Sequence, residues 1–108
     1  MNDTIAGLYD LIKLRKTDPQ EGSYTCYLFE KGTDKILKKV GEEASEVIIS
    51  AKNGENTETA NEICDLLYHL LVLMVAQEIP LEQVMEVLEQ RRQKIGNLKT
   101  FHTSDHNS

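Results

Sequence analysis

Apolar residues recur every three or four positions over most of the chain, which is the spacing of one face of an α-helix. The alternation of apolar and polar residues that marks a half-buried strand is not sustained anywhere in the sequence. The pattern predicts four long helices and one short helix, which cover residues 4–16, 24–30, 33–52, 57–77 and 80–95. We therefore predict an all-α fold.

The ends of these helices are marked by residues that favour turns. The first helix should end at 17–19, because the residue before Pro19 disfavours the helical conformation. Thr33 is the expected N-cap of the second long helix, and Gly54 lies in the polar turn that follows it. Pro80 suits the start of the last helix and Gly96 its end.

Short loops join the helices, so consecutive long helices are expected to pack as an antiparallel helical bundle of about four main helices. The helix over 57–77 is apolar on nearly every side between Leu66 and Ala76. One small domain has few other helices to cover it, so we expect a homodimer or a higher homo-oligomer that forms through helices. We expect residues 1–96 to form a single domain and 97–108 a polar, mobile tail.

Composition narrows the functional classes. The chain has 108 residues, a net charge of −6 and 40% hydrophobic residues, which is typical of a globular domain but not of a nucleic-acid-binding protein. Cys26 and Cys64 lack C-x-x-C spacing, so we interpret them as reduced thiols. No signal peptide is evident, and the longest apolar stretch, 66–76, is too short to span a bilayer. We expect a cytoplasmic protein that does not bind a membrane.

Two pairs of acidic residues form the most informative pattern. Glu43 and Glu46 are three residues apart, as are Glu62 and Asp65. At about 100° per residue, both pairs lie at the margin of an apolar helix face, where negative charge is costly unless it is compensated. Gly54 lies midway between the pairs, so two antiparallel helices that meet at this turn would place the pairs level with each other.

Four carboxylates that converge on one patch need cations between them. Oxygen ligands without cysteine or paired histidines favour Mg²⁺, or Mn²⁺, over zinc. A di-iron carboxylate bundle is the nearest rival site, but it requires Glu-x-x-His on two helices, and neither Glu43 nor Glu62 has a histidine at that spacing. In the simplest alternative, these acids are only solvated surface charges.

The acidic segments also resemble a known signature. Glu42-Glu43-Ala44-Ser45-Glu46 followed by Glu62-Ile63-Cys64-Asp65 is similar to the motif of the MazG-like all-α nucleoside triphosphate pyrophosphohydrolases. Within that superfamily, the chain resembles the phosphoribosyl-ATP pyrophosphatases over residues 5–95. The further segments that carry this resemblance are Gly22-Ser23-Tyr24-Thr25, Lys38-Lys39-Val40-Gly41, Leu66-Leu67-Tyr68-His69-Leu70-Leu71-Val72 and Arg91-Arg92.

The resemblance implies an activity and a set of ligands. The expected reaction is Mg²⁺-dependent hydrolysis of phosphoribosyl-ATP to phosphoribosyl-AMP and pyrophosphate, the second step of histidine biosynthesis. The metal ligands that it implies are Glu43, Glu46, Glu62 and Asp65. We expect Glu42 or Glu46 to orient the attacking water as a catalytic residue, and the sequence does not choose between them.

The candidate substrate-binding residues are Ser23, Tyr24, Thr25, Lys38, Lys39, Arg91 and Arg92. The two lysines either meet phosphate oxygens or pair with glutamates one turn further on. The segment 23–25 either binds a phosphate or only caps a helix. The arginine pair either contacts phosphate or ribose or only complements a helix C-terminus. We expect His69 to form a hydrogen bond to Asp65 rather than to ligate metal.

Two other functions share these features. Another pyrophosphohydrolase of the same superfamily would use the same acids on a different nucleoside triphosphate. A non-enzymatic helical dimer, acting as an interaction module, would carry the acids as surface charge and would tolerate their replacement by glutamine.

Overall fold

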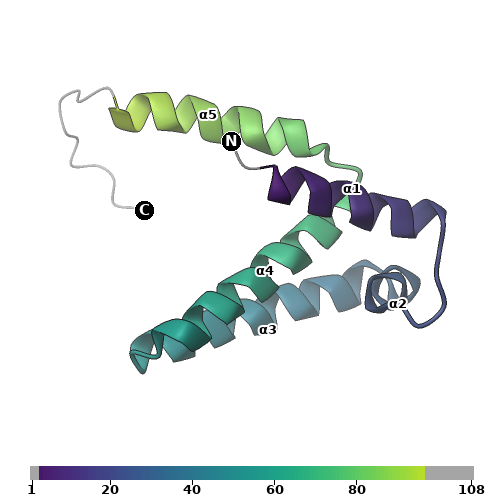
Figure 1. Ribbon diagram of the computed structural model, residues 1–108, viewed down its shortest axis with the longest axis horizontal. Coiled ribbons are helices and arrows are strands. Elements are labelled where there is room, and N and C mark those ends of the chain that lie inside the picture. Colours follow the sequence, from purple (N-terminus) through teal and green to yellow (C-terminus); the bar gives the residue numbers. More distant parts are fainter. Residues whose placement is uncertain (1–2, 97–108) are drawn as a thin grey trace.

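The computed structural model describes residues 3–96, which form five α-helices and no strand (Figure 1). The helices are α1 (Thr4–Thr17), α2 (Tyr24–Lys31), α3 (Thr33–Lys52), α4 (Asn56–Ala76) and α5 (Leu81–Gly96). The predicted all-α fold is confirmed, and each predicted helix end lies within one residue of the observed end. The predicted mobile tail, 97–108, lies outside the described residues.

Local sequence explains how the short α2 fits between two long helices. The side chain of Ser23 accepts a hydrogen bond from the backbone N–H of Cys26 at 3.1 Å, which caps the start of α2. Gly32 has a φ of +97°, a conformation that glycine adopts far more readily than other residues, and it separates α2 from α3. The prediction that Thr33 is the N-cap is therefore wrong: Thr33 is the first residue of α3, because Gly32 makes the break.

The helices α3 and α4 form an antiparallel hairpin, the most extensive helix pair of the structure (Figure 1). The turn at 53–55 includes Gly54 with a φ of +71°, and the N–H of Glu55 donates to the carbonyl oxygen of Ser50 at 3.1 Å. The hydroxyl of Thr59 donates to the Ser50 hydroxyl oxygen at 3.1 Å and joins the two helices beside the turn. This hairpin is the element that positions the acidic residues.

The hydrophobic core surrounds the C-terminal half of α4, where α1, α2 and the start of α3 meet. Its members are Tyr9, Ile12, Leu28, Ile36, Leu71, Val72, Val75 and Leu81. The Tyr9 hydroxyl also donates to the backbone oxygen of Ile79 at 2.9 Å, which fixes α1 against the link that precedes α5. The core is therefore at one end of the hairpin, and the half that carries the turn extends away from it.

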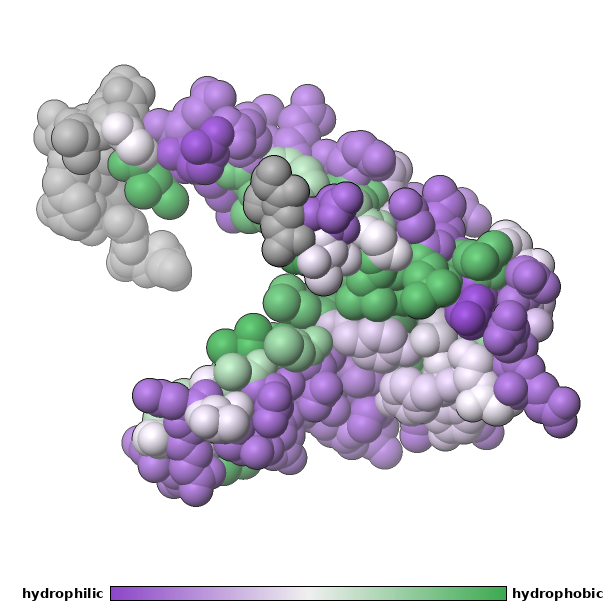
Figure 2. All heavy atoms as spheres, in the orientation of Figure 1, coloured by the Kyte–Doolittle hydropathy of each residue, from purple (hydrophilic) through white to green (hydrophobic). Residues whose placement is uncertain are grey.

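Apolar surface remains exposed away from this core. One chain covers the stretch 66–76 only in part: His69, Leu71, Val72 and Val75 are buried, Leu67 is exposed, and the other six residues are partly buried. Exposed apolar residues on other segments include Ile5, Leu11, Leu14, Leu37, Ile48, Ile49, Ile63, Met85, Val87, Leu88 and Ile95. Figure 2 shows a hollow between α5 and the hairpin, with apolar residues at its inner end.

Among the described helices, α4 has a length and composition that would allow it to cross a membrane. Its C-terminal half instead contributes Leu71, Val72 and Val75 to the protein core. Its N-terminal half carries the acidic residues described below. We therefore interpret α4 as the central helix of the fold.

Candidate active site

The hairpin brings three carboxylates together. Glu43 lies on α3, whereas Glu62 and Asp65 lie on α4. One carboxylate oxygen from each of the three lies within 4.8 Å of the other two. Glu43 and Glu62 are partly buried and Asp65 is exposed, so the group opens towards solvent. The expected convergence of acids across the hairpin is therefore seen for these three residues.

Negative charge is crowded around Glu62. A side-chain hydrogen bond with Glu58 contributes most to raising the pKa of Glu62 to about 7, followed by burial, by contact with Glu43 and by the charge of Glu46. A carboxyl group that holds a proton near neutral pH lies in a field that disfavours its ionised form. A divalent cation at this position would relieve that repulsion.

The donor set fits a hard divalent cation. The three clustered residues offer only carboxylate oxygens, which are the ligands that Mg²⁺ and Mn²⁺ prefer. Cys26 and Cys64 are free thiols, and neither belongs to this cluster. Glu43, Glu62 and Asp65 are thus the residues that would hold such an ion.

The remaining acids differ in their positions. Glu46 is exposed and adds its charge to the field at Glu62, but it is not among the three residues whose oxygens converge. Glu42 points outward, with 47% of its side chain exposed. The sequence reasoning missed Glu58, which lies one turn before Glu62 on α4; that four-residue spacing was the available signal.

Lys39 borders the acidic cluster. Its ammonium nitrogen lies 3.4 Å from Glu42 Oε1 and 3.7 Å from Glu43 Oε2. Burial lowers the pKa of Lys39, but Tyr24 and the two glutamates more than offset it, so the pKa is raised overall. Lys38 is exposed and makes no ion pair within residues 3–96. The hairpin therefore brings one of the two predicted lysines to the carboxylates.

The segment before α2 is held by contacts within the chain. The Ser23 side chain caps the helix, the Tyr24 hydroxyl contacts His69 Nε2 at 3.0 Å, and the Thr25 hydroxyl contacts the Tyr68 hydroxyl. Each side chain thus has a structural partner, and substrate binding by Ser23, Tyr24 and Thr25 stays a prediction. These contacts join the N-terminus of α2 to the helical turn of α4 that follows Asp65.

His69 links that segment to the acidic cluster. It is buried, and its Nδ1 lies 2.7 Å from the backbone oxygen of Asp65. Because a carbonyl oxygen only accepts, Nδ1 carries a proton and donates it to this oxygen, while Nε2 contacts the Tyr24 hydroxyl. The expected hydrogen bond from His69 to Asp65 is confirmed, with the backbone rather than the carboxylate as its partner.

The predicted arginine pair lies on α5, apart from the hairpin (Figure 1). Arg91 and Arg92 are exposed, and Arg92 forms a two-pronged ion pair with Glu89 at 2.8 and 2.9 Å. Within one chain, the structure does not bring either arginine to the acidic cluster. A role for this pair in substrate binding stays a prediction.

The chain is similar in sequence to known proteins over most of its length. Residues 5–92 match the family described as phosphoribosyl-ATP pyrophosphohydrolase. The chain is 59% identical over 98 residues to the phosphoribosyl-ATP pyrophosphatase of Clostridium botulinum (strain Kyoto / Type A2), with 91% of this chain and 89% of that one covered. It is 60% identical over 92 residues to the enzyme of that name from Listeria innocua serovar 6a, with 85% and 88% covered. The chain thus belongs to the phosphoribosyl-ATP pyrophosphohydrolase family.

Proposed function

We propose that this protein is a hydrolase that splits phosphoribosyl-ATP into phosphoribosyl-AMP and pyrophosphate, a step of histidine biosynthesis. The observation that carries the proposal is the convergence of Glu43, Glu62 and Asp65 within 4.8 Å in a chain of this family. Three carboxylates arranged for a divalent cation suit a substrate whose reacting groups are phosphates.

Mg²⁺, or Mn²⁺, would be held by Glu43, Glu62 and Asp65, with Glu46 near enough for its charge to act on Glu62. A bound ion would neutralise negative charge on the phosphate oxygens. Lys39 borders the same carboxylates and supplies a positive charge that can face those oxygens. The chain itself thus provides both ligands for the ion and a cation for the substrate.

Glu46 is the better candidate for orienting the attacking water. Both residues are exposed, but Glu42 is paired with Lys39, whereas Glu46 forms no ion pair among residues 3–96. Its free carboxylate can accept a hydrogen bond from water and take its proton as the water oxygen bonds to phosphorus. The anhydride bond between the α- and β-phosphates then breaks, and pyrophosphate leaves with the bonding electron pair.

The test is pyrophosphate release by the purified protein in the presence of Mg²⁺, with phosphoribosyl-ATP, ATP and dCTP offered separately. Preferential turnover of phosphoribosyl-ATP, abolished by EDTA, is the expected result. Preferential turnover of ATP or dCTP would instead support another pyrophosphohydrolase of the superfamily. A folded protein that releases pyrophosphate from none of them would contradict the proposal and favour a non-enzymatic helical dimer.

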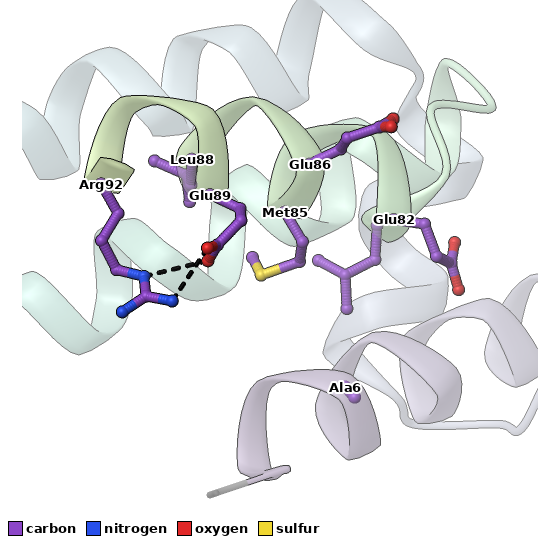
Figure 3. A pocket seen from close by; sticks show the side chains of 8 residues that line it. Ala6, Glu82, Met85, Glu86, Leu88, Glu89 and Arg92 are labelled. Atoms are coloured by element: carbon purple, nitrogen blue, oxygen red, sulfur yellow. Dashed lines mark hydrogen bonds and ion pairs between the residues drawn. The ribbon is translucent and has the colours of Figure 1, made fainter. Parts of the chain in front are cut away.

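We also propose that two copies of the chain pair through α5. Leu81 is the one buried residue of this helix, whereas Met85, Val87 and Leu88 are 40%, 42% and 51% exposed. Met85 and Leu88 of α5 and Ala6 of α1 are among the residues that line a pocket of about 780 Å³ (Figure 3). A second copy would cover this apolar surface, which a single chain leaves in water. We expect the assembled protein to be cytoplasmic, with a nucleotide as its small-molecule partner.

A further inference from the structure

A pair of lysines lies beside an exposed aromatic ring at the junction of α2 and α3. The ammonium groups of Lys31 and Lys35 lie 5.8 and 5.9 Å from the centre of the Tyr27 ring. In the part of the chain from 3 to 96, neither lysine forms an ion pair with a carboxylate, in contrast to Lys39. Two unpaired cations thus gather at one point of a protein whose net charge is −6.

One member of the pair, Lys35, lies on the same helix as the candidate metal ligand Glu43. Lys35, Lys39 and Glu43 follow one another at four-residue intervals along α3, so each step is slightly more than one turn and rises about 6 Å. Lys35 is therefore about 12 Å from Glu43 along the helix axis. The cations extend from the edge of the acidic cluster towards α2.

A row of aromatic rings follows the same course. Tyr24 lies between Tyr27 and Tyr68, with ring centres 6.0 and 6.2 Å apart and interplanar angles of 23° and 29°. Tyr24 and Tyr27 also line a surface pocket of about 600 Å³. Glu21 and Glu30 line this pocket too, and their charges would repel a phosphate there. The pocket is thus better suited to an uncharged flat group than to an anion.

The proposed substrate has chemistry that matches this arrangement. Phosphoribosyl-ATP differs from ATP by a second ribose on its purine, and that ribose carries its own phosphate. The purine and both sugars separate this phosphate from the reacting triphosphate. It therefore requires cations at some distance from the metal ligands, with a surface for the purine between the two charged ends.

We propose that Lys35, assisted by Lys31, binds the phosphate of the substrate's second ribose, and that the purine lies against Tyr24 and Tyr27. This inference rests on the proposed function. Lysines without carboxylate partners can meet a phosphate without first breaking an ion pair. A positive charge that pairs with the phosphate of the second ribose would also let the enzyme distinguish phosphoribosyl-ATP from ATP, which lacks that phosphate.

The test compares the binding of phosphoribosyl-AMP and AMP, measured by calorimetry with Mg²⁺ present. The wild-type protein should bind phosphoribosyl-AMP more tightly. Lys35→Gln should weaken that binding by about tenfold and leave AMP binding unchanged, because a charge-assisted hydrogen bond is worth roughly that factor. Lys35→Arg should retain the preference. Lys52→Gln, which removes the same charge from the exposed last turn of α3, should alter neither affinity.

Two results would overturn the inference. One is an undiminished preference for phosphoribosyl-AMP in the double variant Lys31→Gln/Lys35→Gln, with folding verified by circular dichroism. The other is an equal loss of affinity for both nucleotides, which would mark a general effect of charge. If wild-type protein fails to hydrolyse phosphoribosyl-ATP, the proposed function itself fails; if it succeeds and either result above is found, only this inference does.

Discussion

The α3–α4 hairpin and helix α5 each carry an unfavourable feature that the rest of the chain does not compensate: crowded negative charge on the hairpin and exposed apolar surface on α5. The hairpin packs one helix on the other and closes with hydrogen bonds at Ser50, yet its acids crowd together enough to raise the pKa of Glu62 to about 7. Helix α5 carries balanced charges, such as the pair of Arg92 with Glu89, yet its apolar side chains stay exposed beyond Leu81. One region needs a compensating charge, and the other needs a neighbour.

This difference indicates what each region is for. A protein that crowds carboxylates on a rigid hairpin loses stability there unless the site binds a cation. A helix that leaves apolar residues in water gains stability when another surface covers them. The two regions can therefore be tested separately, by removing charge from the hairpin and by adding charge to α5.

Glu62→Gln should have the largest effect, because it removes one of three converging carboxylates. We expect pyrophosphate release to fall by more than about a hundredfold, since even indirect partners of a metal ligand typically contribute 10–100-fold. Mg²⁺ should also stop raising the melting temperature. Glu55→Gln makes the same change of charge in the exposed turn of the hairpin and should behave like the wild type. Full activity in Glu62→Gln would refute the assigned site.

Leu88→Glu should break the proposed pairing of two copies. Each exposed leucine that a partner covers is worth roughly 1.5 kcal/mol or more, and a symmetric dimer loses two, which weakens association by about a hundredfold. Sedimentation over a dilution series measures this change. Gln90→Glu places the same charge on an exposed polar position of α5 and should leave the dimer intact. A wild-type protein that sediments as a monomer would contradict the pairing.

Glu46→Gln separates the catalytic role from the ligand role within the hairpin. If Glu46 orients the attacking water, the turnover number should fall by at least about tenfold, while Mg²⁺ still stabilises the protein. Steady-state kinetics and melting curves, measured on the same preparation, provide both values. A loss of less than about tenfold would exclude a central role for this residue.

The smallest effect concerns pH. The pKa of Glu62 is raised from 4.5 to about 7, so the folded state holds a proton that the unfolded state releases between those values. The metal-free protein should therefore lose stability as pH rises from about 4.5 through about 7. With EDTA present, its melting temperature should be higher at pH 5.5 than at pH 8. Glu62→Gln should lack this contribution to the pH dependence of stability. An unchanged slope of melting temperature against pH in this variant would show that another group causes the dependence.

The fold was largely predictable because its signals are local. Apolar spacing gave the helices, and glycines marked breaks: Gly54 lies in the hairpin turn and Gly32 separates α2 from α3. The prediction that the two acid pairs lie level with each other followed from counting the residues on either side of Gly54. Such arithmetic succeeds here because two straight helices joined by a short turn keep their register.

The details of the site depend on side-chain directions, which periodicity does not specify. A margin position was assigned to both Glu43 and Glu46, yet only Glu43 brings a carboxylate oxygen within 4.8 Å of both Glu62 and Asp65. Glu58 was overlooked because its hydrogen bond with Glu62 depends on side-chain direction, although it contributes most to the raised pKa of Glu62. The contacts of Tyr24 with His69 and of Thr25 with Tyr68 span more than 40 residues, beyond the reach of local patterns.

The short turn of the hairpin also has a consequence for how the chain folds. Loops of this size close within about 100 ns, and contacts between residues near in sequence form early. The hairpin should therefore assemble within one chain at a rate that does not depend on protein concentration. If a second copy covers α5, that later step is bimolecular, and its rate should rise with concentration. Refolding followed at several dilutions would then divide into a constant phase and a concentration-dependent phase.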